Sequence, residues 1–199
     1  MINYVSKNQV EFTIPIRNDI FLSSIQHIFG GVLNKTWNKL YFHCDSKIGS
    51  LKDDGDVLTY ADALVMVHCL SRQIQFLYER KFVFVGLDIA DIFVSEDRSM
   101  FFIANFRNLI PVDHEFMAPF YKPRFISEEI MAVSKIPWKM SGGAMKPYYC
   151  LGALVIHLLK FSDDVDVVIK ADVVMKSIRY TKLYWVLEQC LKSNKIVFL

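Results

Sequence analysis

The sequence has 199 residues, 53% of them hydrophobic and 22% charged, and a formal net charge of +2. This composition excludes a disordered chain, and the small net charge gives no electrostatic reason to expect a nucleic acid or an anionic membrane as partner. The length suits a single domain, 1–199, but the apolar share exceeds what such a domain usually buries, so we expect a protein partner to cover part of the surface.

The first 56 residues predict a small section of mixed strands and helix. Residues 10–17 are typical of an edge strand, because Pro15 has no amide hydrogen to give to a central ladder. Residues 19–29 place apolar side chains at helical spacing and end at two glycines. Residues 39–44 predict a further strand, and the polar residues 45–56 predict a loop.

The clearest helix is predicted over 60–79. Thr59 and Asp62 have the spacing of a capping box, with Asp in place of the usual Glu or Gln. The helix also carries an apolar stripe that is predicted to be buried, consisting of Leu64, Val67, Ile74, Leu77 and Tyr78. His68 on this helix and His157 further along lie among apolar residues, and we interpret both as core histidines rather than ligands.

Short strands and a long irregular stretch follow. The strands are predicted at 82–85, 91–94 and 100–104, with a hairpin loop between the last two. The stretch 107–147 holds five of the six prolines and is predicted to be irregular, which at this length is typical of a binding segment.

The chain is predicted to end in helices. The first, 148–160, is apolar all round and is expected at the centre of the fold. A helix at 164–177 and an amphipathic helix at 183–192 follow it. Taken together, the elements predict the α+β class.

This order of elements, with several short motifs, resembles the protein kinase family. In that family a long helix leads into H-R-D-L-x-x-x-N, a strand pair leads to D-F-G, and a loop ends at A-P-E. Here F-V-G-L-D-I-A-D, from Phe84 to Asp91, stands in the place of the first motif, and N-F-R at 105–107 in the place of D-F-G. S-E-E at 127–129 matches A-P-E only in its last residue, and P-Y-Y-C-L-G from Pro147 stands for D-x-W-S-L-G.

The resemblance covers residues 39–192 and implies a kinase-like fold made mainly of the helical C-terminal lobe. It implies a reduced N-lobe-like section at 1–45 and a C-lobe-like section at 46–199. Too few residues precede the hinge-like segment for a pair of strands with a Gly-rich loop, and no G-x-G-x-x-G is present. Arg17 stands where the family has the lysine of V-A-I-K.

The motif positions lack the groups that phosphoryl transfer requires. The family's catalytic base is a carboxylate, whereas Gly86 has no side chain. Asn105 replaces the metal-binding carboxylate and is a weaker ligand for a hard cation, and Arg107 adds a fixed positive charge next to Phe106. With Asp91 in place of the family's asparagine, we expect no catalysis, no cofactor and no small-molecule substrate.

Two alternatives remain open from the residues alone. Asp88 and Asp91 lie close together before a strand, with Asn105 expected opposite, which would suit a shifted divalent-metal site and an atypical or residual nucleotide-binding phosphotransferase. The simpler interpretation of these residues is a solvated turn in which Asp91 caps backbone amides. The other alternative is a helical fold unrelated to kinases, in which the order of motifs is coincidental.

The cysteines predict a reducing compartment such as the cytoplasm. Cys44, Cys69, Cys150 and Cys190 are far apart, form no C-x-x-C pair and lie among apolar residues, which favours buried free thiols over disulfides or zinc. No apolar run reaches the roughly 18 residues of a membrane span. The N-terminus lacks the apolar core of a signal peptide.

We therefore expect a catalytically inactive, pseudokinase-like scaffold or subunit of a larger assembly. Many Phe, Ile, Asn and Lys residues suit a compact AT-rich genome, such as that of a large DNA virus, with the virion or a viral factory as further locations. The expected contact surface is the Pro-rich segment 111–138, whose aromatics suit a protein interface. These are Phe116, Phe120, Tyr121, Phe125 and Trp138. The alternative is that they fold back over the former cleft.

Overall fold

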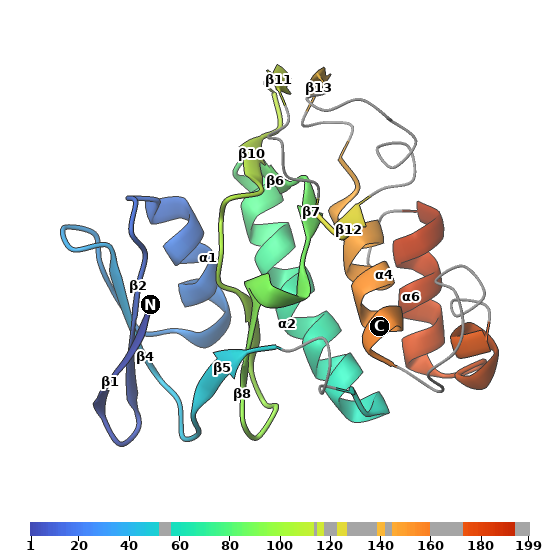
Figure 1. The fold of residues 1–199 in the computed structure, drawn as a ribbon, viewed down its shortest axis with the longest axis horizontal. Coiled ribbons are helices and arrows are strands. Elements are labelled where there is room, and N and C mark those ends of the chain that lie inside the picture. The colour runs from blue at the N-terminus through green and yellow to red at the C-terminus, as the bar shows by residue number, and fades with distance from the viewer. Residues whose placement is uncertain are drawn as a thin grey trace.

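The computed structural model describes the chain in seven stretches. They are 1–51, 57–113, 115–117, 123–126, 139–141, 145–159 and 173–193, with backbone alone for 115–117 and 139–141. The fold is α+β, as predicted. A small sheet lies at one side of the molecule, a long helix in the middle, and helices α4 (Pro147–Leu158) and α6 (Lys182–Ser193) at the other side (Figure 1).

The N-terminal sheet is antiparallel, with strand order β1-β2-β4-β3. Its strands are β1 (Ile2–Ser6), β2 (Gln9–Thr13), β3 (Val32–Asn34) and β4 (Lys39–His43). The prediction of β4 is confirmed. The edge assignment of 10–17 is wrong, because β2 ends at Thr13 before Pro15 and pairs on both sides, with β1 and β4. The sequence analysis missed β1 and β3.

Helix α1 (Asp19–Phe29) has the predicted bounds, and its ends explain them. The Asn18 side chain accepts a hydrogen bond from the amide of Phe21 at 3.0 Å, which caps the N-terminus. The helix ends at Gly30, whose φ of 73° lies in the left-handed region that glycine adopts at least cost. Phe21, Leu22 and other residues of α1 are fully buried beneath the sheet and against α2 (Tyr60–Glu79).

Helix α2 also begins and ends as predicted. The capping box is present: Asp62 N donates to Thr59 Oγ1 at 3.2 Å, and Thr59 N donates to Asp62 Oδ2 at 2.9 Å. Of the predicted stripe, Val67, Ile74 and Leu77 are buried and Leu64 is partly buried.

Two predictions on α2 are wrong. Tyr78 is 52% exposed, and His68 is exposed rather than in the core. The buried face runs through Met66, Leu70 and Leu77, and His68 lies two positions, or about 200°, round the helix from Met66, on the opposite face. Tyr78 stands in the last turn of α2, at the margin of the buried face. His157 is 8% exposed, as expected for a core histidine.

Gln73 joins α2 to both neighbouring layers from a fully buried position. Its Nε2 donates to Ser24 Oγ on α1 and to the carbonyl oxygen of Ile103, both at 3.1 Å, and its Oε1 accepts from Ile103 N at 2.8 Å. All three bonds are made in the interior, where an unpaired amide would be costly. Gln73 therefore fixes the position of the segment that leads into residues 104–107.

Short antiparallel strands fill the middle of the molecule. One three-stranded sheet has the order β5-β8-β9, and three two-stranded sheets pair β6 with β10, β7 with β12, and β11 with β13. Their bounds are β5 (Ile48–Ser50), β6 (Phe82–Phe84), β7 (Gly86–Leu87), β8 (Ile92–Ser95), β9 (Phe101–Ile103), β10 (Leu109–Pro111), β11 (Glu115–Met117), β12 (Phe125–Ile126) and β13 (Lys139–Ser141). A 3₁₀ turn, η1 (Ile89–Asp91), precedes β8.

These strands bear on the sequence predictions in two ways. β6, the strand pair β8 and β9, and the turn between that pair are confirmed within a residue or two. Five short strands, β5, β10, β11, β12 and β13, lie in stretches predicted to be loop or irregular. Strands of two or three residues are too short to show a period of two, so no pattern could have indicated them.

Helix α4 (Pro147–Leu158) is central, as predicted. Leu151 and Leu154 are fully buried, and α4 packs against both α2 and α6 (Lys182–Ser193). A Cβ at Gly152 would lie 2.9 Å from Cys190 Cβ, so the two helices approach closely at this glycine. Residues 173–177 are helical, in agreement with part of the predicted helix 164–177, and 164–172 lie outside the described residues.

All four cysteines are buried and free, as predicted. Burial raises the pKa of the Cys190 thiol to about 12. Among the described helices, none is both long and apolar enough to cross a membrane.

Replacing Leu151 with Ala should lower the free energy of unfolding by about 2–5 kcal/mol, because it opens a cavity between α4 and its neighbours. Urea denaturation measures the change. Val173→Ala is the control, since Val173 is 49% exposed. Equal midpoints for the two variants would mean that α4 does not hold the core together.

Candidate functional site

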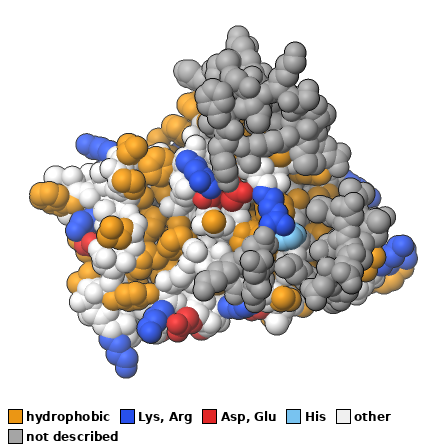
Figure 2. All heavy atoms as spheres, viewed as in Figure 1, with side chains coloured by type: hydrophobic (Ala, Val, Ile, Leu, Met, Phe, Trp, Pro, Cys, Tyr) orange, Lys and Arg blue, Asp and Glu red, His pale blue; other side chains and the backbone are white. Residues whose placement is uncertain are grey.

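An arginine and two carboxylates form the candidate site. Nη2 of Arg107 lies 3.3 Å from Asp88 Oδ2 and 3.1 Å from Asp91 Oδ1. The two acidic side chains are 12% and 5% exposed, and that of Arg107 is 43% exposed. Figure 2 shows acidic side chains near the middle of this face with Lys or Arg side chains on either side. The two carboxylates are therefore nearly buried, and the guanidinium that pairs with them is partly exposed to solvent.

The β8–β9 hairpin brings the members of the cluster together. Asp88 precedes η1 and Asp91 ends it, immediately before β8, while residues 105–107 follow β9. The ladder places Ile92 opposite Ile103, and one step further Ala104 N donates to the carbonyl oxygen of Asp91 at 2.8 Å. The register of the hairpin therefore sets the side chain of Asp91 beside those that follow β9.

Asn105 links the acidic turn to the arginine. Its Nδ2 donates to Asp91 Oδ1 at 3.1 Å, and its Oδ1 accepts from the backbone amide of Arg107 at 3.0 Å. Phe106, between them in sequence, packs on Phe21 of α1 with ring centroids 5.3 Å apart. The segment is therefore held from both sides.

Asp88 extends the cluster to the next strand. Its Oδ1 accepts from the backbone amide of Arg124 at 2.8 Å, just before β12. The guanidinium of Arg124 lies 5.6 Å from the ring centroid of Phe125. Sequence analysis did not single out Arg124, because no local pattern signals a contact between residues 36 positions apart.

Burial raises the pKa of Asp91 above its usual range. The positive charge of Arg107 opposes this increase, the neighbouring charge of Asp88 adds to it, and the hydrogen bond from Asn105 opposes it. The ionised form of Asp91 therefore depends on Arg107.

The cluster does not suit a divalent cation. The structure brings Asp88, Asp91 and Asn105 together, as the metal hypothesis requires, but a guanidinium already bridges the carboxylates and Asn105 turns its NH₂ group toward Asp91. Nowhere in the described part of the chain do three His, Cys, Asp or Glu side chains gather as a metal site. A metal would have to displace Arg107 and turn Asn105 over.

Gly86 stands at the position where the kinase resemblance would require a catalytic base. β7 pairs with β12, with Gly86 opposite Ile126. A Cβ at this glycine would lie 2.7 Å from the carbonyl oxygen of Phe125 and 2.8 Å from Pro123 Cβ. The backbone near β12 therefore occupies the space that a carboxylate side chain would need.

A pocket of about 460 Å³ adjoins the cluster. Its lining includes Asn105, Phe106 and Arg107, together with residues of the segment between β2 and α1. Ile14, Pro15, Phe93 and other apolar groups make up most of the lining. Arg17, which stands in the place of the family's lysine, is not among the lining residues and pairs with Asp19 at 3.1 Å, with 67% of its side chain exposed.

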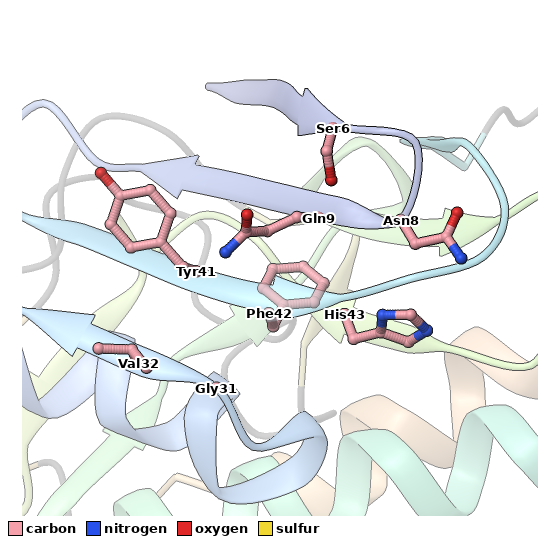
Figure 3. A pocket seen from close by; sticks show the side chains of 8 residues that line it. All are labelled: Ser6, Asn8, Gln9, Gly31, Val32, Tyr41, Phe42 and His43. Atoms are coloured by element: carbon pink, nitrogen blue, oxygen red, sulfur yellow. The ribbon is translucent and has the colours of Figure 1, made fainter.

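A larger pocket, of about 620 Å³, lies over the N-terminal sheet and contains no charged pair. Figure 3 shows its lining side chains, which come from β1, β2, β3, β4 and the turns beside them. The hydroxyl of Tyr41 in this lining hydrogen-bonds to Glu11, which raises the pKa of the tyrosine. His43 pairs with Asp45 at 3.0 Å. The two titratable side chains of the described lining, Tyr41 and His43, are thus each paired with a carboxylate that is not part of the lining.

Only one predicted interface side chain is described, and its assignment is corrected. Phe125 is 6% exposed, and its ring lies 5.5 Å from that of His157, so it belongs to the core between β12 and α4. The side chains of Phe116, Phe120, Tyr121 and Trp138 lie outside the described residues. Sequence analysis could not distinguish Phe125 from these, because the same aromatic composition suits a core and an interface.

No protein-family model matches the sequence, and a comparison with curated proteins found no match. The function must therefore be argued from the geometry of the site.

Replacing Arg107 with Gln should destabilise the fold by about 1–2 kcal/mol at pH 7, less than the roughly 3–5 kcal/mol of a fully buried pair, because Arg107 is 43% exposed. Without the guanidinium the raised pKa of Asp91 rises further, so the loss should be largest where Asp91 is ionised. It should shrink as the pH falls below that raised pKa. Urea unfolding at pH 7 and at acidic pH measures both effects.

Arg17→Gln is the matched control, since it removes an exposed arginine–aspartate pair. The same loss at both pH values, or the same loss in the control, would contradict the role assigned to Arg107.

Replacing Gly86 with Ala should cost about 1–3 kcal/mol, because the added methyl group collides with the backbone next to β12. Gly49→Ala in β5 is the control, since a Cβ there meets nothing within 4 Å. Thermal unfolding compares the two variants. If Gly86→Ala is as stable as Gly49→Ala, β12 does not close the space beside Gly86.

Proposed function

We propose that this chain is a catalytically inactive, protein kinase-like protein that acts through protein contacts, as a scaffold or a subunit of a larger assembly. The observation that carries the proposal is the position of Arg107 between Asp88 and Asp91. Under the kinase alignment, a bound metal ion would have to be held at this place. A guanidinium supplies positive charge and hydrogen bonds, but it cannot coordinate carboxylate and phosphate oxygens together as a metal ion does.

Spatial proximity of the aligned motif positions supports the kinase-like part of the proposal. The family holds its metal ions with the asparagine and the D-F-G aspartate of the two motifs. Their counterparts here, Asp91 and Asn105, are hydrogen-bonded to each other at 3.1 Å. Two residues separated by 14 positions thus meet as the alignment requires. Compared with the family, the aspartate and the asparagine have swapped positions between the two motifs.

The inactive part of the proposal has two supports besides Arg107. Gly86 offers no proton acceptor, and the backbone beside it leaves no room for one. Arg17, which stands in the place of the phosphate-binding lysine under the kinase alignment, is exposed and pairs with Asp19. Base, metal and phosphate contacts would all have to be supplied by other residues.

A second candidate is residual nucleotide binding with atypical phosphotransfer through Asp88 and Asp91. The pocket of about 460 Å³ next to Asn105 and Arg107 is the observation in its favour. Measuring whether ATP with magnesium stabilises the fold separates the two candidates.

ATP with magnesium at millimolar concentration should leave the melting temperature unchanged. A ligand that binds only the folded state must stabilise it in proportion to the logarithm of its excess over the dissociation constant. Thermal unfolding is measured with ATP and magnesium, with magnesium alone, and in the Asp91→Ala variant.

Asp45→Ala, at a carboxylate that is 70% exposed on the N-terminal sheet side, controls for general charge effects. A dose-dependent rise that Asp91→Ala abolishes and Asp45→Ala preserves would contradict the inactive assignment and favour the phosphotransferase.

A further inference from the structure

A group of exposed cations and aromatics lies on the segment that leads into α6. Lys176 is on the helical turn 173–177, Arg179 and Tyr180 are in the turn after it, and Lys182 and Trp185 are on the first turn of α6. All five side chains belong to exposed residues. We call this group the basic–aromatic surface.

The two aromatic side chains of this surface, Tyr180 and Trp185, are exposed to solvent rather than packed in the core. Tyr180 is 77% exposed and Trp185 is 48% exposed. The ring of Trp185 meets that of Tyr184 edge-on at 5.3 Å, and the guanidinium of Arg179 lies 4.9 Å from the ring centroid of Tyr180. Tyr180 and Trp185 are thus exposed rings outside the core, and a guanidinium lies beside that of Tyr180.

The backbone at Tyr180 strengthens this interpretation. Its φ is 69°, in the left-handed region, at the end of a helical turn where glycine is favoured. A tyrosine here bears a conformational cost and gains little burial within the chain. The side chain of Tyr180 therefore contributes little to the stability of the fold, and glycine would serve the backbone at this position equally well.

The cations of the surface lack an acidic partner among the described residues. In the described part of the chain, no carboxylate pairs with Lys176, Arg179 or Lys182. By contrast Lys192, at the other end of α6, pairs with Glu188 at 2.8 Å. Within the described ranges, the positive charge of the surface is thus left without a paired carboxylate.

The surface is fixed from beneath. Val174, Ile178 and Leu183 are buried in the core, and Tyr184 N donates to Thr181 Oγ1 at 3.2 Å where α6 begins. A preformed surface loses less conformational entropy when a partner binds.

We infer that the basic–aromatic surface binds an acidic segment of a partner protein that carries an apolar or aromatic side chain. Tyr, Trp and Arg are enriched among the residues that contribute most to binding at protein interfaces. The positive charge of Lys176, Arg179 and Lys182 is complementary to carboxylates on a partner. A nucleic acid fits less well, because three cations are fewer than the roughly 6–10 phosphate contacts of typical binding. The inference rests on the proposed function, which it deepens by giving the chemistry of the partner.

The probe is a fluorescein-labelled peptide, Glu-Glu-Leu-Phe-Asp-Glu-Leu, titrated with the whole chain at low salt and followed by fluorescence anisotropy. Lys176→Glu combined with Lys182→Glu should weaken binding about tenfold or more, by replacing attraction with repulsion. Lys7→Glu combined with Lys47→Glu makes the same change of net charge on the N-terminal sheet side and should leave binding unchanged. Tyr180→Gly should weaken binding without lowering the melting temperature, because glycine suits the left-handed backbone.

The last variant separates binding from folding, since a residue that served only the fold could not show that combination. Absence of binding, equal binding by all variants, or an equal loss in the Lys7 and Lys47 control would overturn the inference. Tighter binding of oligothymidylate than of the peptide would overturn it in favour of a nucleic acid. None of these outcomes affects the ATP experiment, so the surface and the inactive site are tested separately.

Discussion

The ion pairs of Arg107 with Asp88 and Asp91 set the arrangement of the middle of the molecule. Two carboxylates that are almost buried repel each other and lose hydration, so the fold requires a cation between them. Arg107, in the segment that follows β9, supplies that cation. Asn105 donates a hydrogen bond to Asp91, and Asp88 accepts one from the backbone amide just before β12. One charged cluster thus ties together η1, the segment after β9 and a strand much further along the chain.

The same cluster limits what chemistry can take place at this position of the fold. Metal-dependent phosphoryl transfer needs a cation that can exchange its ligands. A guanidinium is covalently attached to the chain and remains positively charged, so it cannot take that role. Gly86 adds a steric limit to this electrostatic one, because β12 packs directly on it. Charge balance and close packing therefore both favour a structural role for residues that, in a kinase alignment, occupy motif positions.

Long, strongly patterned elements were predictable from the sequence, and contacts between distant short segments were not. The bounds of α1 and α2 follow from local signals, Gly30 after one and the Thr59–Asp62 box before the other. The sequence also indicated that Asp88, Asp91 and Asn105 would converge, because hairpin geometry is local. It could not show that Arg107 bridges the carboxylates, that β12 packs on Gly86, or that Phe125 is buried, since those depend on tertiary packing.

A chain that binds through its surface needs rigidity beneath that surface more than it needs a reactive site. α4 is buried nearly all round and packs on both α2 and α6, so the outer face of α6 is anchored to the centre of the fold. The charged cluster and the basic–aromatic surface use their cations differently: Arg107 is committed to two carboxylates, while no carboxylate among the described residues pairs with Lys176 or Lys182. Paired charge holds the interior together, whereas the proposed contact with a partner depends on cations for which the described residues provide no carboxylate.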